Sequence, residues 1–185
     1  MTTSEFWLAT SFDYIITYSL NRGPKLDAIQ EAAKLLVKEI RSQLLVVPSS
    51  QLPLLRKQLR LLERTHGIDM LSLTQGPTAY NITASPVSVI SRDSPEQLEL
   101  AGILQAPVLN RMYWMCGPVY RDALAFYDAQ DNLTAVLNIC FDCDQMLTHT
   151  GEEVEADTAT YKQLLHFLIQ KGHSISNPDG MPGNE

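Results

Sequence analysis

Two cysteines three residues apart give the clearest chemical signal in the sequence. Cys140 and Cys143 form a C-x-x-C pattern at the end of the apolar run LTAVLNIC. This spacing supplies half of a four-ligand zinc site, and it is also found in thiol–disulfide redox centres. His149 follows closely in the chain. The metal interpretation therefore assigns Cys140, Cys143 and His149 as ligands of a possible zinc ion, with Cys116 as a further candidate member of the site.

Whether these cysteines can react together depends on where the preceding strand ends. In a continuous strand, Cys140 and Cys143 would point to opposite faces with their Cα atoms about 10 Å apart. A disulfide needs a separation below about 7 Å, so any shared chemistry requires a turn at Phe141 and Asp142. Asp142 and Asp144 disfavour a thiolate and suit a cation. A purely structural role remains the third interpretation, because free cysteines are among the most buried residues.

A second candidate site is a basic stripe on a helix predicted over residues 51–66. Leucines at helical spacing line one face of this helix, and the opposite face carries Arg56, Lys57, Arg60 and Arg64. Such a stripe can dock on an acidic protein or on a nucleic-acid backbone. It can also be an ordinary solvated face, since basic residues near a helix C-terminus interact favourably with its dipole.

The third candidate is the loop NRMYWMCGPVY, which concentrates aromatic residues and methionine. Tyr113 and Trp114 are its most prominent members, and these residue types are enriched at the energetic centres of protein interfaces. The loop can equally cover the end of a hydrophobic core. Motifs of P-loop, serine-hydrolase, zinc-protease and dinucleotide-binding enzymes are absent from the sequence, so an enzyme with a pocket near Trp114 ranks behind a binding role.

The composition narrows the class of protein. The chain has 185 residues, of which 45% are hydrophobic and 19% charged, with a net charge of −7. This size and composition predict one domain with a substantial core. The negative charge makes nucleic acid an unlikely general partner. No apolar stretch is long enough for a membrane span, no secretion signal is evident, and three cysteines predict reduced thiols in the cytoplasm.

Strands and helices alternate along the chain. Hydrophobic periodicity predicts helices from residue 24 to about 41, over 51–66, over 95–105 and over about 157–171. Alternating or continuous apolar runs predict strands within 11–20, 43–50, 68–74 and 80–92, and a β-hairpin over 123–140. Residues 108–122 are predicted to be loop.

Together these patterns predict an α+β domain over residues 1–172, with a mixed or antiparallel sheet, about four helices, and a C-terminal hairpin followed by a helix. Residues 173–185 contain few apolar positions and are predicted to form a flexible tail. The expected function is that of a small non-catalytic module that binds another protein. The alternative is a cysteine site, either zinc-binding or thiol-redox, centred on residues 140–143.

Overall fold

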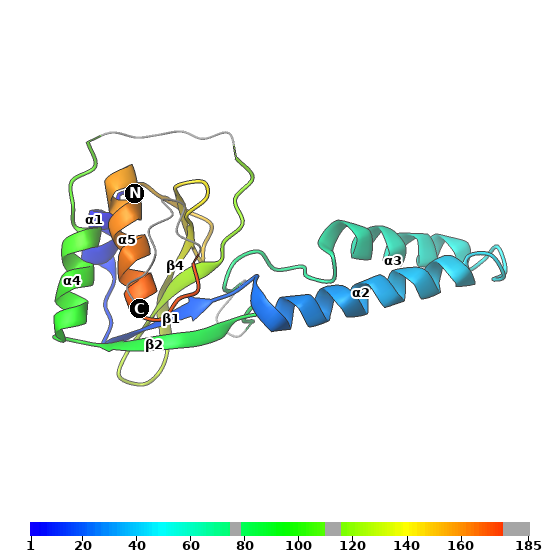
Figure 1. The fold of residues 1–185 in the computed structure, drawn as a ribbon, viewed down its shortest axis with the longest axis horizontal. Helices are drawn as coiled ribbons and strands as arrows, with labels where there is room; N and C mark the ends of the chain where they lie inside the picture. The colour runs from blue at the N-terminus through cyan, green and yellow to red at the C-terminus, as the bar shows by residue number, and fades with distance from the viewer. Residues whose placement is uncertain (75–78, 110–115, 176–185) are drawn as a thin grey trace, which may run out of the picture.

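The structure is a computed structural model that describes residues 1–74, 79–109 and 116–175. In these residues the chain forms a six-stranded antiparallel sheet and five helices (Figure 1). The strands are β1 (Tyr14–Ser19), β2 (Ser85–Ser91), β3 (Asp122–Tyr127), β4 (Leu133–Cys140), β5 (Gln145–Thr148) and β6 (Glu153–Val154), in the spatial order β2-β1-β3-β4-β5-β6. The helices are α1 (Thr3–Ala9), α2 (Gly23–Gln43), α3 (Leu52–Thr65), α4 (Pro95–Leu104) and α5 (Thr158–Gln170). The α+β prediction, with its hairpin and C-terminal helix, is confirmed.

Three helices cover one face of the sheet and form the main core. Leu124 and Phe126 of β3 alternate with residues that face the opposite side, and they meet α1, α4 and α5 (Figure 1). Local sequence fixes these helices. Ser94 caps α4 by accepting a hydrogen bond from the Gln97 amide, 3.1 Å away. Gly172, at φ +96°, ends α5 with a left-handed turn that L side chains rarely adopt.

The described residues cover the opposite face of the sheet only in part. Its buried residues include Ala123, Ala125 and Val136 from β3 and β4, with Leu73 packed on them from the segment that follows α3. The amide of Leu73 donates to the side-chain oxygen of Asn138 at 2.7 Å, which attaches that segment to the sheet. Tyrosines from β1 and β3 occupy the remaining part of this face.

Helices α2 and α3 form a hairpin, residues 23–66, that projects from the rest of the molecule (Figure 1). We refer to the remainder of the described chain as the sheet body. At the base of the hairpin, Gly67 has φ +87°, and a Cβ atom there would lie 2.9 Å from the Cβ of Ala33. Glycine is therefore required both by the backbone conformation and by the close approach of the chain to α2.

Two of the predicted strands are wrong. Residues 43–50 form the tip of the hairpin, where Leu45 and Val46 are 86% and 83% exposed. Residues 68–74 form a bend with one isolated bridge, between Thr74 and Tyr80. In both segments a short apolar run resembles a buried strand, but neither segment joins the sheet that the described residues form.

Several elements were not predicted from the sequence. Helix α1 is short, and its capping box between Thr2 and Glu5 lies at the start of the chain. Strands β5 and β6 have four and two residues, too few for a clear periodicity. Residues 173–175, assigned to the predicted tail, contact the sheet body through the buried side chain of His173, and residues 176–185 lie outside the described ranges.

Within the described ranges, every helix falls short of the length and apolarity that crossing a bilayer requires.

Candidate functional site

The C-x-x-C pattern lies at the turn that its chemistry requires. Strand β4 ends at Cys140, and residues 141–144 form the turn that leads into β5. The bond that forms, however, joins Cys143 to Cys116, with the two Cα atoms 6.0 Å apart. Cys140 remains a free thiol and is 1% exposed. The structure therefore differs from the expectation of three reduced thiols.

Two of the predicted metal ligands, Cys140 and Cys143, lie in one buried cluster, and this cluster does not include His149. The sulfur of Cys143 is in the disulfide and is not available as a thiolate ligand. His149 is half-buried, and its Nδ1 atom has no hydrogen-bond partner. Among the residues that the structure describes, no group of three His, Cys, Asp or Glu side chains is arranged to hold a metal ion.

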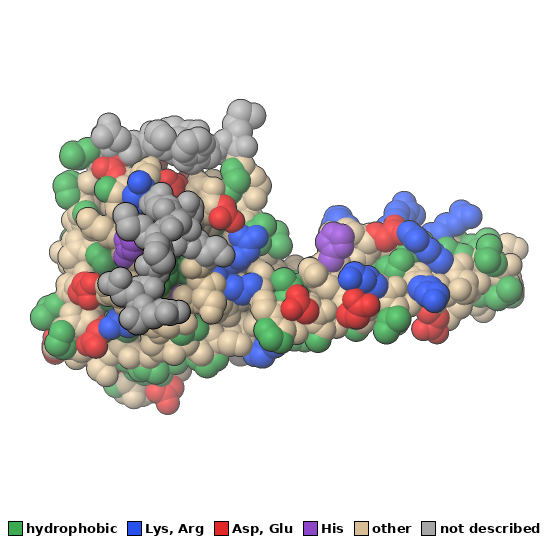
Figure 2. Space-filling model, in the orientation of Figure 1, with side chains coloured by type: hydrophobic (Ala, Val, Ile, Leu, Met, Phe, Trp, Pro, Cys, Tyr) green, Lys and Arg blue, Asp and Glu red, His purple; other side chains and the backbone are tan. Residues whose placement is uncertain are grey.

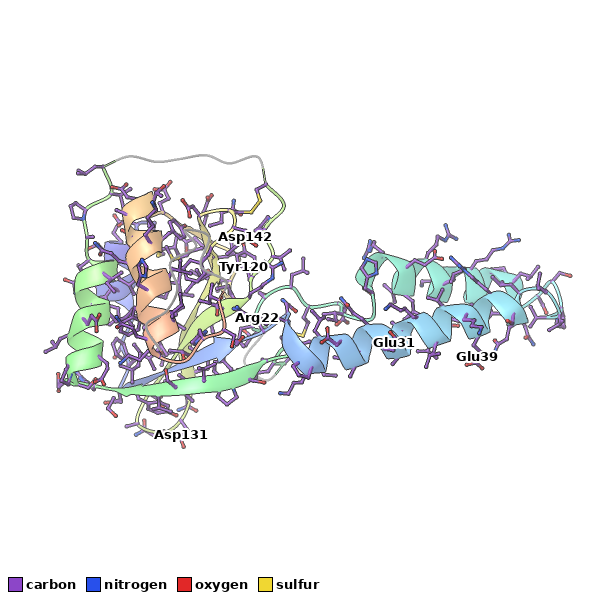
Figure 3. The ribbon with its side chains drawn as sticks, in the orientation of Figure 1. Arg22, Glu31, Glu39, Tyr120, Asp131 and Asp142 are labelled. Carbon is purple, nitrogen blue, oxygen red and sulfur yellow. A yellow bond between two sulfur atoms is a disulfide. The ribbon has the colours of Figure 1, made fainter. Side chains whose placement is uncertain are left out.

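Cys140 belongs to the same buried cluster as one half of the disulfide. It forms a small buried cluster with Cys143 and Tyr120, and Leu147 packs against this cluster. Burial is the main factor that raises the pKa of Tyr120. The free thiol and the disulfide thus lie in one buried cluster at the β4–β5 turn, which also carries Asp142 (Figure 3).

Tyr113 and Trp114 of the predicted aromatic loop lie outside the described residues.

The basic stripe is solvent-exposed. The side chains of Arg56, Lys57, Arg60 and Arg64 are all exposed, whereas the leucines on the opposite side of α3 are half-buried against α2. Glu63 is the acidic residue of α3, and it pairs with Arg41 of α2 at 2.8 Å. Within the described part of the chain, the four cations of the stripe form no ion pair with a carboxylate.

Charge is segregated between the hairpin and the rest of the chain. Residues 23–66 contain eight Lys or Arg and four Asp or Glu, a net charge of +4. The rest of the chain contains six Lys or Arg and 17 Asp or Glu, a net charge of −11. Figure 2 shows basic side chains gathered along α3 on the projecting hairpin.

The hairpin also exposes apolar side chains and two grooves. Leu54 and Leu61, one heptad apart on α3, are 61% and 53% exposed. They line a groove of about 580 Å³ together with Lys57 and Arg64. A larger groove, of about 800 Å³, runs between α2 and α3 and includes Leu45 at the hairpin tip. Apolar surface rimmed by charge is typical of interaction sites.

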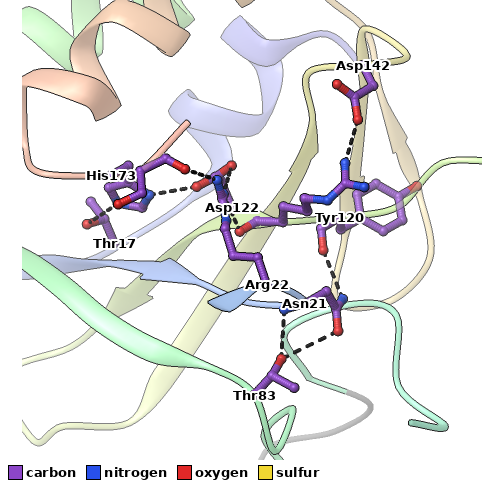
Figure 4. Close-up of polar contacts among 10 residues, drawn as sticks. Thr17, Asn21, Arg22, Thr83, Tyr120, Asp122, Asp142 and His173 are labelled. Carbon is purple, nitrogen blue, oxygen red and sulfur yellow. Dashed lines mark hydrogen bonds and ion pairs between the residues drawn. The ribbon is translucent and has the colours of Figure 1, made fainter. Parts of the chain in front are cut away.

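One polar cluster in the sheet body was missed by the sequence reasoning. The Nδ1 atom of His173 lies 2.7 Å from Oδ1 of Asp122, and its Nε2 atom lies 2.8 Å from the hydroxyl of Thr17 (Figure 4). The Thr17 hydroxyl is also 2.9 Å from that of Ser88. Asp122 forms an ion pair with Arg22, whose guanidinium donates to the backbone oxygens of Ser174 and Arg121.

The arrangement Thr17–His173–Asp122 has the order of a hydrolase triad. Thr17, Asp122 and His173 are only 0%, 1% and 4% exposed, however, and a nucleophile must be reached by its substrate. With its proton on Nδ1, His173 donates to Asp122 and accepts from Thr17, so every polar atom of the group is satisfied. This geometry favours a structural tie between the end of α5 and strands β1 and β3.

Sequence offered no signal for this tie. Thr17, Asp122 and His173 are separated by more than 50 residues from one another, and only the sheet register and the turn at Gly172 bring them together. A cavity of about 360 Å³ adjoins it, lined in part by Arg22 and Arg121. Both arginines are already paired, Arg22 with Asp122 and Arg121 with Asp142, so neither has its charge free for a ligand.

Comparison of the chain with protein-family models, curated proteins and solved structures found no match.

Proposed function

We propose that this protein is a macromolecule-binding module that presents the α2–α3 hairpin to an acidic protein partner. The observation that carries the proposal is the surface of α3. It combines four exposed cations that lack carboxylate partners within the described residues with two exposed leucines, on a hairpin that projects from an acidic body.

The charge distribution supports recognition by complementarity. A positive hairpin next to a negative body gives the molecule a strong local field despite its net charge of −7. Such fields steer an oppositely charged partner into the correct orientation and disfavour wrong partners. Arginine is also enriched among residues that dominate binding energy. An acidic surface would neutralise the stripe without displacing any ion pair that the described residues form.

The apolar residues indicate the form that the partner takes. Leu54 and Leu61 lie two helical turns apart, and the groove they line is flanked by Lys57 and Arg64. An amphipathic helix places its anchoring side chains at this spacing. We therefore expect the partner to contribute a helix with an apolar stripe bordered by Asp or Glu.

Nucleic acid fits this surface less well. The chain outside the hairpin is more negative, at −11, than the whole chain, at −7, and would repel the phosphate backbone over any extended contact. Apolar anchors such as Leu54 and Leu61 also gain little from a phosphate backbone. Nuclease treatment separates the two classes of partner.

Site-specific photo-crosslinking tests the proposal. The photoreactive residue p-benzoylphenylalanine replaces Leu61 on the hairpin or, as a matched control, Leu98 of α4, which is 64% exposed on the sheet body. We expect a defined adduct with an acidic protein from the Leu61 position that survives nuclease and disappears at high salt. Equal adducts from both positions, or an adduct removed by nuclease, would contradict the proposal.

Charge variants make this test specific. Arg56→Gln/Arg60→Gln removes two charges from the stripe, and Arg92→Gln/Lys162→Gln removes two from exposed positions of the sheet body. The net charge changes equally in both proteins. We expect only the first variant to lose the Leu61 adduct, because general electrostatics would affect both alike.

The three cysteines support a second candidate function, thiol–disulfide exchange. Cys140 shares a small buried cluster with Cys143, whose sulfur is bonded to that of Cys116. In the exchange, the Cys140 thiolate attacks the sulfur of Cys143, the Cys143–Cys116 bond breaks, and Cys116 leaves as a thiolate that takes up the proton lost by Cys140. No external oxidant is required, because one disulfide replaces another.

Disulfide mapping by mass spectrometry tests this candidate. After incubation at mildly alkaline pH and acid quenching, we expect a fraction of the protein to carry the Cys140–Cys143 bond. Cys140→Ala is the control that cannot exchange. If only the Cys116–Cys143 bond is found at every time point, Cys140 has a packing role alone.

A further inference from the structure

The second face of the sheet, on the side of Ala123 and Ala125, contains a groove in which four of the eight lining residues are tyrosines. This groove has a volume of about 450 Å³ and lies far from the hairpin tip. Four tyrosines line it, Tyr14 and Tyr18 of β1, Tyr127 of β3 and Tyr80 of the segment before β2, together with Asp131 of the β3–β4 loop. Figure 3 shows Asp131 on that loop, at the edge of the sheet body.

Hydrogen bonds fix the tyrosine rings in place. The Tyr127 hydroxyl lies 2.7 Å from that of Tyr80 and 3.3 Å from that of Tyr18. The ring of Tyr14 stacks on that of Tyr127, with centroids 5.1 Å apart and planes 7° apart. Tyr14 donates from its hydroxyl to Oδ1 of Asp131 at 2.9 Å. These contacts preorganise the groove, so a ligand would not have to order it.

The charge that the described residues place in the groove is negative. Asp131 is the charged residue of its lining, and Asp128 lies close enough to act on Tyr14 electrostatically. No Lys or Arg side chain is among the described residues that line it. Tyrosine faces are themselves negative because of the ring quadrupole. Aromatic faces and a carboxylate therefore act in the same direction on any ligand in this groove.

We propose that the groove formed by Tyr14, Tyr18, Tyr80, Tyr127 and Asp131 binds an organic ammonium ion. Aromatic side chains attract cations over their faces, and quaternary ammonium groups are the ligands that aromatic sites bind characteristically. The proposal is independent of the hairpin, which lies on other elements and carries the opposite charge.

The chemistry of the groove distinguishes this ligand from others. A metal ion such as Ca²⁺ requires six or more oxygen ligands, and a single carboxylate does not provide them. An alkylated ammonium ion spreads its charge over methyl groups, so little hydration is lost when it contacts aromatic rings. A neutral ligand of the same shape would gain the apolar contacts but not the attraction of Asp131 and the ring faces.

Titration of the full chain with small probes tests the site. The tyrosine rings are ¹³C-labelled, and their NMR signals are followed during addition of tetramethylammonium chloride or choline chloride, with sodium chloride at equal ionic strength as the blank. The neutral isostere of choline, 3,3-dimethylbutan-1-ol, is titrated in parallel. We expect choline to bind about tenfold more tightly than the isostere, because only choline carries a charge that the tyrosine rings and Asp131 attract.

A matched pair of variants locates the effect. Asp131 has φ +62°, a conformation that asparagine tolerates well, so Asp131→Asn removes the charge without disturbing the loop. Glu39→Gln makes the same charge change on the exposed surface of α2. We expect Asp131→Asn to weaken choline binding about fivefold and Glu39→Gln to leave it unchanged. Equal binding of choline and its neutral isostere, or equal effects of the two variants, would overturn the proposal.

A further titration distinguishes two possible sources of the ammonium group, a modified protein and a small metabolite. A short peptide with Nε-trimethyllysine is compared with its unmodified lysine counterpart and with free choline. Tighter binding of the methylated peptide identifies a modified protein as the ligand, and tighter binding of choline identifies a small metabolite. Either result supports the ammonium site, whereas absence of tyrosine shifts with every cationic probe would overturn it.

Discussion

The sheet body and the α2–α3 hairpin differ in how far their apolar side chains are buried. In the sheet body, large side chains such as Phe126, Leu137 and Phe167 are at most 1% exposed, and three helices cover one face of the sheet. In the hairpin, only Ala33 and Ile40 are buried, and none of the residues of α3 is. The two helices are in contact mainly with each other.

This difference separates stability from recognition. Burial of large apolar side chains is the dominant favourable term in folding, so the sheet body supplies most of the stability. The hairpin contributes little core, and its exposed leucines and cations are available for other contacts. Substitutions in the sheet body should therefore change stability, and substitutions on the hairpin should change binding.

The largest effect is expected in the aromatic centre of the sheet body. Phe126 is fully buried and makes edge-on contacts with Phe6 and Phe12, with ring centroids 5.5 and 5.2 Å apart. Phe126→Ala leaves a cavity and should lower the free energy of unfolding by about 3 to 5 kcal/mol, measured by urea denaturation. A loss below about 1 kcal/mol would mean that this core is not the main source of stability.

A second prediction compares two Arg–Asp pairs that differ in burial. The Asp122 side chain, paired with Arg22 and His173, is 2% exposed, whereas the Asp142 side chain, paired with Arg121, is 72% exposed. Asp122→Ala leaves the half-buried Arg22 and the buried His173 without their carboxylate partner and should cost about 3 kcal/mol. Asp142→Ala should cost less than about 1 kcal/mol. Similar losses in the two urea titrations would show that burial does not decide the strength of these contacts.

Alkaline pH should weaken the sheet body in a defined direction. Burial raises the pKa of Tyr161 and of Tyr127 well above the usual value near 10. In the unfolded chain both tyrosines ionise near pH 10 and in the folded chain they do not, so the stability they contribute is complete below pH 10 and declines above it. Above pH 10, the ionisation of each tyrosine in the unfolded chain should lower the free energy of unfolding by about 1.4 kcal/mol per pH unit.

Tyr161→Phe is the variant that checks this origin. It removes one of the two ionisations and keeps the ring, which is 4% exposed. Urea denaturation at several pH values between 9 and about 11 should therefore give a shallower decline for this variant than for the wild-type protein. An unchanged slope would assign the alkaline sensitivity to other groups.

Hydrophobic periodicity in the sequence was sufficient to predict the longer helices and strands, because their apolar patterns extend over many residues. Helix α2 and helix α5 show apolar stripes over many residues, and the hairpin β3–β4 shows a polar turn between two apolar runs. Periodicity failed where length was short. The apolar residues Leu45 and Val46 resemble a buried strand in the sequence, but their position between two antiparallel helices leaves them at a tip with no sheet to join.

The candidate sites also divide into those that local sequence predicts and those that depend on residues far apart in the chain. The basic stripe of α3 could be derived because residues four apart share a helical face, and the turn at Cys140 was recognised as the condition for cysteine chemistry. The Cys116–Cys143 bond, the Thr17–His173–Asp122 tie and the tyrosine groove could not be derived. Each depends on residues far apart in the sequence that meet only through the strand order β2-β1-β3-β4 and its register.

The smallest effect on stability is expected at the exposed leucines of α3. Leu54→Ala/Leu61→Ala removes apolar groups that are already in solvent, and alanine favours the helix at least as well as leucine. The free energy of unfolding should change by less than about 0.5 kcal/mol in urea titrations, while the Arg56/Arg60 stripe stays intact. If the leucines are anchors for a partner helix, this variant should nevertheless lose the protein adduct formed by p-benzoylphenylalanine placed at Gln58, between the two leucines in the same groove. A stability loss comparable to that of Phe126→Ala would show instead that the hairpin leucines belong to the folding core, and the separation between a stabilising body and a recognising hairpin would then be abandoned.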